Sequence, residues 1–206
     1  MCHHYRTANN LPEHFVEEYH FRTDQRKLFE GIAGGLKDGG AWPLSIVPAL
    51  RIDETGELKT FGAEWGLLPR WWKPSDKSPK REKFQRSTFN ARSETAATKP
   101  TFRSAMKDRR CLVPFLEFHE KDHYFGTGAP MAFAGLWESW LGEDGDVQSV
   151  TFLTTEPNAE VSSIGHDRMP VLLDTPEVRR RWLINGADDE MLKPFADGML
   201  SIRSKG

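Results

Sequence analysis

The chain has 206 residues and a formal net charge of −2; 38% of its residues are hydrophobic and 11% are aromatic. A chain of this length can bury one sizeable core, and its aromatic content argues against a disordered protein. No apolar run reaches the ~18 residues of a membrane span, which excludes a helical transmembrane protein. The opening MCHHYRTANN lacks the pattern of a secretory signal, and two cysteines exclude a disulfide-rich scaffold, so we expect a cytoplasmic protein.

Basic residues are concentrated in one stretch, residues 70–110, which we call the basic segment. It holds 13 Lys and Arg against 4 Asp and Glu, whereas the rest of the chain holds 15 basic and 26 acidic residues. Such an excess is either a solvated surface loop or a patch that binds phosphates, and charge alone does not separate the two.

In chain order, the first part of the sequence predicts a helix, a loop and two strands. A helical segment lies within the first 40 residues, and the glycine-rich stretch 31–43 predicts a loop. Apolar residues gather at 44–53 and 59–69, where we expect strands. The polar, lysine-rich stretch 73–86 predicts a further loop.

The middle of the chain predicts a divided helix followed by strands. Ser93 is expected to cap a helical segment over 93–110, which Pro100 divides. Runs rich in apolar or β-branched residues predict strands at 110–118, 149–155 and 168–173.

The remaining segments decide the fold class. A hairpin is expected at 124–140 and a turn at 142–146, and helices are expected at 176–184 and 188–197. Because strands and helices do not alternate as βαβ units, we predict an α+β fold with a mixed, largely antiparallel sheet. No linker divides the chain, so we expect a single domain over residues 1–206.

Cys2 becomes the N-terminal residue if the initiator methionine is removed, and removal is favoured before a small residue. Its α-amine, with a pKa of about 8, and its thiol then stand on adjacent carbons. Together they can capture an aldehyde, first as a Schiff base and then as a five-membered thiazolidine. The alternative, an incidental residue on a frayed terminus, is favoured by position alone. Adjacent Cys2, His3 and His4 have poor spacing for a metal, so we expect no metal and no cofactor.

Two further polar clusters are candidates for chemistry or binding. FNARSET (89–95) places Asn90 and Arg92 between small or apolar neighbours, although the same residues fit a helix start. In EFHEK (117–121), strand alternation puts Glu120 on the same face as apolar Phe118. A carboxylate there is partly buried, which raises its pKa and suits acid–base work, whereas the alternative is a solvated glutamate at a turn.

A histidine and a tryptophan pair complete the candidates. His166 lies in IGHDRMP and is either a structural residue or an acid, base or phosphate contact at a turn. Trp71 and Trp72 stand between Arg70 and Lys73; we expect one ring to pack in the core and the other to stack on a base.

Five of these pieces occur in one order: Cys2, WGLLPRWW, FNARSET, RCLVPFLEFHE and GHDRMP. The series resembles the SRAP (SOS response-associated peptidase) family, whose members crosslink themselves to abasic sites in single-stranded DNA. The resemblance implies a curved sheet or open barrel flanked by helices, and such DNA as the partner. We expect a monomer. It implies catalytic roles for Cys2, Asn90, Glu120 and His166, and DNA contacts by Trp71, Trp72, Lys73, Arg92, Thr155 and His4.

The sequence departs from the family pattern beside the nucleophile and after the glutamate motif. His3 and His4 replace the usual Gly-Arg, Lys121 replaces a Trp, and GAWP (40–43) replaces the usual Asn-x-Ala-Pro. A His in place of Arg removes a permanent phosphate partner.

The resemblance implies a reaction in which the Cys2 amine attacks C1′ of an abasic deoxyribose and the thiol closes a thiazolidine. The covalent bond protects the damaged strand in the DNA damage response, and the Schiff base also permits a weak lyase activity. Two alternatives stay open: an N-terminal-nucleophile peptidase that removes its own Met1, and a non-catalytic single-strand binding module in which Cys2 is idle.

Overall fold

The computed structural model describes residues 2–8, 13–18, 22–76, 79–142 and 145–204. Its centre is a ring of strands in which β3 pairs with β4, β4 with β10, β10 with β9, β9 with β6, and β6 again with β3. The bounds are Ile46–Ile52 (β3), Leu58–Trp65 (β4), Arg110–Phe115 (β6), Met131–Gly142 (β9) and Gly145–Thr155 (β10). The β4–β10 pair is parallel and the others are antiparallel, so the ring is a closed, mixed barrel.

Three short strands extend the barrel sheet. β5 (Asn90–Arg92) lies parallel to β10, while β11 (Met169–Pro170) and β12 (Leu172–Leu173) pair with β10 and β9. Two of the motifs singled out in the sequence, NAR and RMP, are therefore bound to the same strand.

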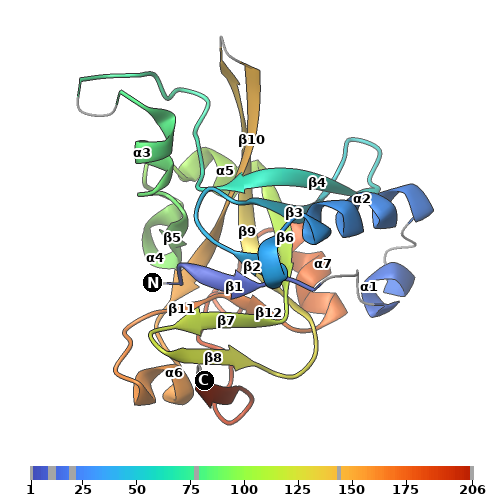
Figure 1. Cartoon of the computed structure of the whole chain (residues 1–206), viewed down its shortest axis with the longest axis vertical. Coiled ribbons are helices and arrows are strands. Elements are labelled where there is room, and N and C mark those ends of the chain that lie inside the picture. The colour runs from blue at the N-terminus through green and yellow to red at the C-terminus, as the bar shows by residue number, and fades with distance from the viewer. Residues whose placement is uncertain (1, 9–12, 19–21, 77–78, 143–144, 205–206) are drawn as a thin grey trace.

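A second sheet lies below the barrel in Figure 1, in the order β13-β8-β7-β1-β2. Its strands are His4–Arg6 (β1), Gly40–Ala41 (β2), Glu117–Glu120 (β7), His123–Gly126 (β8) and Ser201–Ser204 (β13). Only Leu116 separates β6 from β7, so the run RCLVPFLEFHE passes directly from the barrel into the second sheet.

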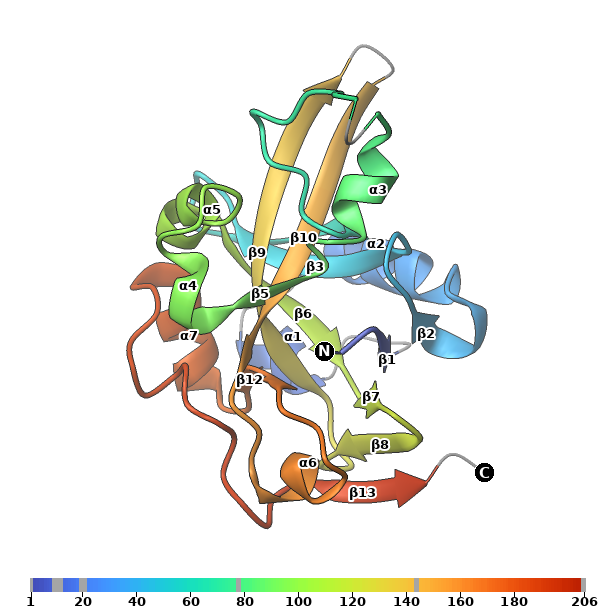
Figure 2. The same cartoon turned by 90° about the vertical axis from the view of Figure 1, so that its left-hand side faces the viewer.

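Helices surround the barrel, as Figure 2 shows. Their bounds are Glu13–Glu18 (α1), Thr23–Gly34 (α2), Arg81–Gln85 (α3), Ser93–Ala96 (α4), Arg103–Asp108 (α5), Ala159–Ser163 (α6) and Pro176–Ile184 (α7), with a 3₁₀ turn, η1, at Lys37–Gly39. α2 packs on β3 and β4, and α7 packs on β6. In the part of the chain described, no helix is long and apolar enough to cross a membrane.

The core lies on both faces of the barrel wall. Along β6, Cys111, Val113 and Phe115 face a cluster that also contains Tyr5 and Trp65. Leu112 faces the opposite way, into the cluster beneath α2 and α7 that includes Phe29 and Trp182. A strand buried on both faces reads as a continuous apolar run, which explains the strand signal of RCLVPF.

The predicted α+β class with a mixed, largely antiparallel sheet is confirmed, and so are the strands near 44–53, 59–69, 110–118 and 149–155. Pro100 does separate two helices, and the helix at 176–184 is present. The short strands β1, β2 and β13 were not predicted, because runs of two to four residues carry no usable periodicity. Part of the turn expected at 142–146 lies outside the described residues.

Several other predictions were wrong. The loop at 31–43 instead contains the end of α2, because Ile32 packs against β4 at Gly62, and tertiary packing outweighs the helix cost of glycine. The segment 124–140 is no hairpin: β8 pairs with β7 and β13, whereas β9 pairs with β6 and β10.

Three more predictions about local structure were also wrong. The stretch 188–197 forms turns rather than a helix. Asp188 Oδ1 accepts a hydrogen bond from Met191 N, and Pro194 has no backbone N–H with which a helix could continue. The loop at 73–86 contains α3. Ser93 is the first residue of α4 rather than its cap, and the capping position is Arg92.

Candidate active site and nucleic-acid interface

Cys2 is fully buried immediately before β1. Its Sγ donates to the carbonyl oxygen of His4 at 3.3 Å, and Asn90 Nδ2 donates to the carbonyl oxygen of Cys2 at 2.6 Å. Burial raises the pKa of the thiol well above its ordinary value, and the nearby Glu120 carboxylate adds to that rise. Cys2 is therefore fixed at its backbone, and its thiol needs a proton acceptor before it can react. Met1 lies outside the described residues.

The pairing of β1 with β7 brings a carboxylate to this end of the chain. His4 pairs with His119 in antiparallel register, so the residues before His4 lie opposite those after His119. Glu120 thus stands at the edge where Cys2 lies, and its side chain is 1% exposed. Burial raises the pKa of Glu120 to about 7. The predicted buried carboxylate with a raised pKa is what the structure has.

His166, in the segment between α6 and β11, contacts Glu120. Its Nε2 lies 3.0 Å from Glu120 Oε2, and its Nδ1 lies 2.8 Å from the carbonyl oxygen of Arg168. A carbonyl only accepts, so Nδ1 carries a proton and Nε2 is the acceptor of the neutral ring. Burial lowers the pKa of His166. Burial therefore raises the pKa of the acid and lowers that of the base, and both shifts favour the uncharged forms of the two groups.

The segment that carries His166 is clamped at two points. Lys121, with a left-handed φ of 51°, donates from Nζ to the carbonyl oxygens of Ile164 and Gly165 at 2.7 and 2.8 Å. Arg168 makes a bidentate pair with Glu94 at 2.6 and 2.9 Å. Sequence reasoning missed both contacts, although Lys121 and Glu94 stand inside the motifs it singled out.

β5 carries Asn90 and Arg92 at its two ends, and the two side chains differ in burial. Asn90 is buried with its amide on Cys2, while Arg92 is exposed. The parallel pairing of β5 with β10 at Phe152, Leu153 and Thr154 fixes this arrangement. One residue of the motif therefore holds the backbone of Cys2, and the other faces solvent.

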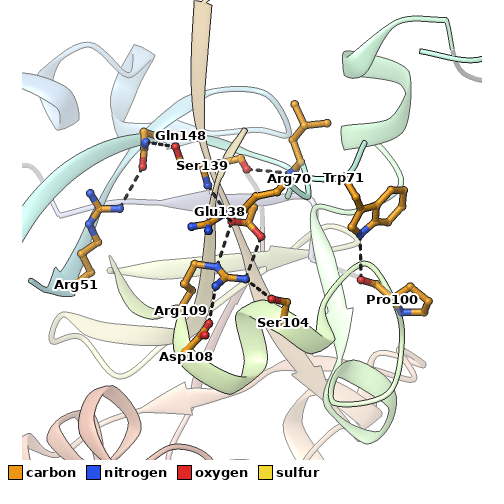
Figure 3. A network of polar contacts seen from close by, with 12 residues as sticks. Arg51, Arg70, Trp71, Pro100, Ser104, Asp108, Arg109, Glu138, Ser139 and Gln148 are labelled. Atoms are coloured by element: carbon orange, nitrogen blue, oxygen red, sulfur yellow. Dashed lines mark hydrogen bonds and ion pairs between the residues drawn. The ribbon is translucent and has the colours of Figure 1, made fainter. Parts of the chain in front are cut away.

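The tryptophan pair divides as the sequence predicted. Trp71 is 55% exposed, and Figure 3 shows its Nε1 donating to the carbonyl oxygen of Pro100, at 3.3 Å. Trp72 is 5% exposed and packs edge-on against Trp140 at 5.7 Å between ring centres. A buried ring is not available to a base, so the stacking role expected of the pair falls to Trp71.

A buried carboxylate anchors the loop that carries Trp71. Figure 3 shows Glu138 of β9, with a side chain 4% exposed, between Arg70 and Arg109. Arg70 Nε lies 2.8 Å and Arg109 Nε 3.1 Å from Glu138 Oε1. Arg109 also donates to Ser104 of α5 at 2.6 Å. Part of the positive charge of the basic segment is therefore used within the fold, while Lys73 and Arg92 remain exposed.

The two remaining residues expected to contact DNA are buried. Thr155 is 4% exposed, and its hydroxyl donates to the carbonyl oxygen of Leu192 at 2.6 Å. His4 is 7% exposed, with its ring stacked on Trp42. Burial makes supporting roles the better fit for both side chains. Among the residues the structure describes, no three His, Cys, Asp or Glu side chains gather as a metal site.

Fold and site together define a class: an α+β barrel protein whose second residue is a cysteine beside a buried carboxylate–imidazole pair. A family model described as SOS response associated peptidase (SRAP) matches residues 1–204, and the chain belongs to that family. The resemblance drawn from the five motifs is thereby confirmed.

The similar proteins include named relatives and solved structures. "Abasic site processing protein YoqW" of Bacillus subtilis (strain 168) is 39% identical over 147 residues, covering 65% of this chain and 62% of that protein. "Abasic site processing protein HMCES" of Xenopus tropicalis is 30% identical over 170 residues, covering 68% of this chain and 49% of that protein. The matches thus span between about half and 62% of the relatives' length.

Two crystal structures share the fold. A protein from Bacteroides thetaiotaomicron has a TM-score of 0.78 at 22% identity, covering 98% of this chain and 91% of that one. A protein from Bordetella bronchiseptica has a TM-score of 0.73 at 25% identity, covering 98% and 99%.

Proposed function

We propose that this protein processes abasic sites in single-stranded DNA by forming a covalent bond between Cys2 and the deoxyribose aldehyde. The observation that carries the proposal is the position of Cys2, whose carbonyl oxygen accepts from the Asn90 amide and whose thiol lies near the buried Glu120–His166 pair. The relatives named abasic site processing proteins, at 39% and 30% identity, support the same function. The bond would protect the damaged strand in the DNA damage response.

The reaction begins once Met1 has been removed. The Cys2 amine adds to C1′ of the open-chain sugar, and the resulting carbinolamine loses water to give a Schiff base. The protonated Glu120 carboxyl supplies the proton that leaves with the hydroxyl as water, and the proton lost from the amine nitrogen passes through His166 Nε2 back to the carboxylate. The Asn90 amide holds the Cys2 carbonyl, which fixes the direction of the amine.

The thiol then closes the ring. Sγ adds to the Schiff-base carbon, and the thiol proton passes to the Glu120–His166 pair, which delivers a proton to nitrogen. The pair is needed because burial keeps the thiol protonated near neutral pH. A Schiff base at C1′ also permits β-elimination of the 3′ phosphate, which gives a weak lyase activity until the thiazolidine forms.

Strand binding falls to the exposed part of the basic segment. Lys73 and Arg92 are placed to neutralise phosphates, and Trp71 offers an exposed ring to a base. We propose that the protein acts as a monomer on such a strand.

The test is denaturing gel electrophoresis of the purified protein with an abasic-site oligonucleotide, beside an intact strand of the same sequence. Mass spectrometry first confirms that the protein starts at Cys2. We expect a shifted band with the abasic strand alone, lost in Cys2→Ser and retained in Cys111→Ser, the matched change at the other cysteine. A stable band in Cys2→Ser overturns the thiazolidine step. Peptide turnover without any band favours the peptidase, and strand binding that survives Cys2→Ala without a band favours the binding module.

A further inference from the structure

A large open cavity lies on the other side of β1 from the Glu120–His166 pair. Its volume is about 1010 Å³, and its wall comes from the end of α2, the segment from η1 to Ile46, and the strands β1, β8 and β13. The side chains that matter to the argument are His4, Arg6, Lys37, Trp42, Tyr124 and Arg203. His4 and Trp42 stand where the sequence departs from the family pattern, and the proposed reaction does not use this cavity.

An aromatic stack forms one wall. The indole of Trp42 lies parallel to the His4 imidazole, with ring centres 4.0 Å apart and an angle of 3° between the planes. His4 is almost fully buried, whereas Trp42 is 47% exposed, so the indole is covered on the His4 side and open to the cavity. The His4 ring is held in place, because His119 and Tyr124 meet it edge-on with ring centres 5.3 and 6.0 Å away.

Close backbone approach is needed for this stack. A Cβ on Gly40 would lie 3.1 Å from His4 Nε2, so glycine at this position leaves room for the ring. An exposed tryptophan held flat on a buried ring is a rigid platform, and sequence-tolerant stacking of bases on aromatic rings is how single strands are commonly held.

The wall next to the stack is basic. The guanidinium of Arg203 lies 4.6 Å from the centre of the Tyr124 ring, and it shares the carboxylate of Glu117 with Arg6, at 2.9 and 3.6 Å. Two guanidinium groups on one carboxylate leave one positive charge in excess. Lys37 and Asp38 on the rim offset each other in formal charge. The wall therefore carries about the charge that one phosphodiester neutralises.

We propose that this cavity is a nucleotide subsite for the strand that reacts with Cys2, in which a base flanking the abasic site stacks on Trp42 and its phosphate faces Arg6 and Arg203. The inference rests on the proposed function, since the strand is the one bound at Cys2. His4 and Cys2 stand two residues apart at the start of β1, an extended distance of about 7 Å. That reach suits a neighbouring nucleotide rather than a distant one.

The test uses strands that bind but do not react, so it does not depend on the crosslink. A central tetrahydrofuran residue replaces the abasic sugar, and in two further strands the base on its 5′ or its 3′ side is removed as well. Equilibrium binding is measured by fluorescence anisotropy for the wild type, Trp42→Ala, Trp42→Phe and Trp71→Ala. Thermal unfolding confirms that each variant is folded.

We expect removal of one flanking base to weaken wild-type binding about tenfold. In Trp42→Ala, affinity for the complete strand falls by a similar factor, and removal of the flanking base causes no further loss. Trp42→Phe retains most of the affinity. Trp71→Ala weakens binding but keeps the response to the flanking base. Additive losses, or unchanged binding in Trp42→Ala, overturn the subsite.

Two measurements separate the strand subsite from a free-nucleotide site and from the proposed reaction. If a free deoxynucleoside monophosphate binds with the same dependence on Trp42 while the strands show no coupling, the cavity takes a free nucleotide, and the strand subsite is wrong. If the losses from Trp42→Ala and from removal of the flanking base are not additive, but an abasic strand never crosslinks, the subsite stands and the proposed reaction fails.

Discussion

The Cys2 site and the basic segment organise their polar groups in opposite ways. At the Cys2 site, the side chains of Asn90, Glu120 and His166 are fully or mostly buried, and each holds a defined partner. In the basic segment, Arg70 and Arg109 converge on Glu138 inside the fold, while Lys73 and Arg92 face solvent. Burial strengthens each interaction and makes the site specific, whereas exposed charges give a contact that salt screens. Chemistry and strand binding should therefore fail in different ways when they are mutated.

The largest effect on the rate of the proposed reaction is expected from a change at Glu120. Glu120→Gln keeps the shape of the side chain but can neither give nor take a proton. We expect the rate of crosslinking to fall by about 100- to 10,000-fold, with strand affinity unchanged. Single-turnover gels measure the rate, and anisotropy measures the affinity. An unchanged rate would remove Glu120 from the reaction.

The Glu138 cluster should contribute to stability rather than to the reaction. Glu138→Gln leaves Arg109 buried without its carboxylate, so we expect the free energy of unfolding to fall by ~3 kcal/mol. Arg70→Ala removes only an exposed partner and should cost less than about 1 kcal/mol. Urea denaturation measures both variants. Equal losses for the two would contradict the distinction between buried and exposed pairs.

The raised pKa of Glu120 links stability to pH. The folded state keeps the proton up to about pH 7, whereas the unfolded carboxyl loses it near 4.5. Because the folded state then binds more protons, the free energy of unfolding should fall as pH rises from about 4.5 to about 7. Glu120→Gln should flatten that decline. Denaturation of both proteins across this range provides the comparison, and parallel profiles would contradict the assigned shift.

A smaller effect is expected where Lys121 clamps the segment that carries His166. Lys121→Met releases the carbonyl oxygens of Ile164 and Gly165, and we expect crosslinking to slow by about tenfold. The pKa of His166, lowered chiefly by burial and further by the Lys121 charge, should rise. Histidine proton resonances followed by NMR report that rise. Lys121→Arg preserves the charge and should restore the lower pKa; a variant that merely loses stability would show no such reversal.

The smallest effect is expected at an exposed charge. Arg92→Gln should weaken strand binding a few-fold and reduce the slope of log affinity against log salt by about 0.7, the share of one phosphate. Arg22→Gln removes an arginine that is also exposed but lies outside the basic segment, and it serves as the control. Equal slopes in both variants would mean that Arg92 does not face the strand.

The two regions also differed in how far the sequence predicted them. Alternation with Phe118 gave a buried Glu120 as one of two alternatives, and the structure has that one. One ring of the Trp71–Trp72 pair was expected in the core, and that ring is Trp72. Strand alternation and composition are local properties, so they can be read without a fold. The family resemblance named Cys2, Asn90, Glu120 and His166 together, and the structure brings these four residues to one site.

What escaped prediction depends on contacts between distant segments. The Arg168–Glu94 pair joins residues 74 positions apart, and the Glu138–Arg109 pair joins residues 29 apart. The stack of Trp42 on His4 requires β1 and β2 to lie side by side, and both strands are too short to signal themselves. Residues such as Thr155 were therefore assigned to the surface although their hydroxyls are engaged inside.

The position of Cys2 at the start of β1 has a mechanical consequence. In the proposed reaction, a strand of DNA joined to Cys2 would transmit any pull through His3 into β1, which has three paired positions on β7 and two on β2. Tension along the DNA would therefore load the shortest interior strand of the second sheet first. The proposed attachment point would thus also be the place where force begins to unfold the protein.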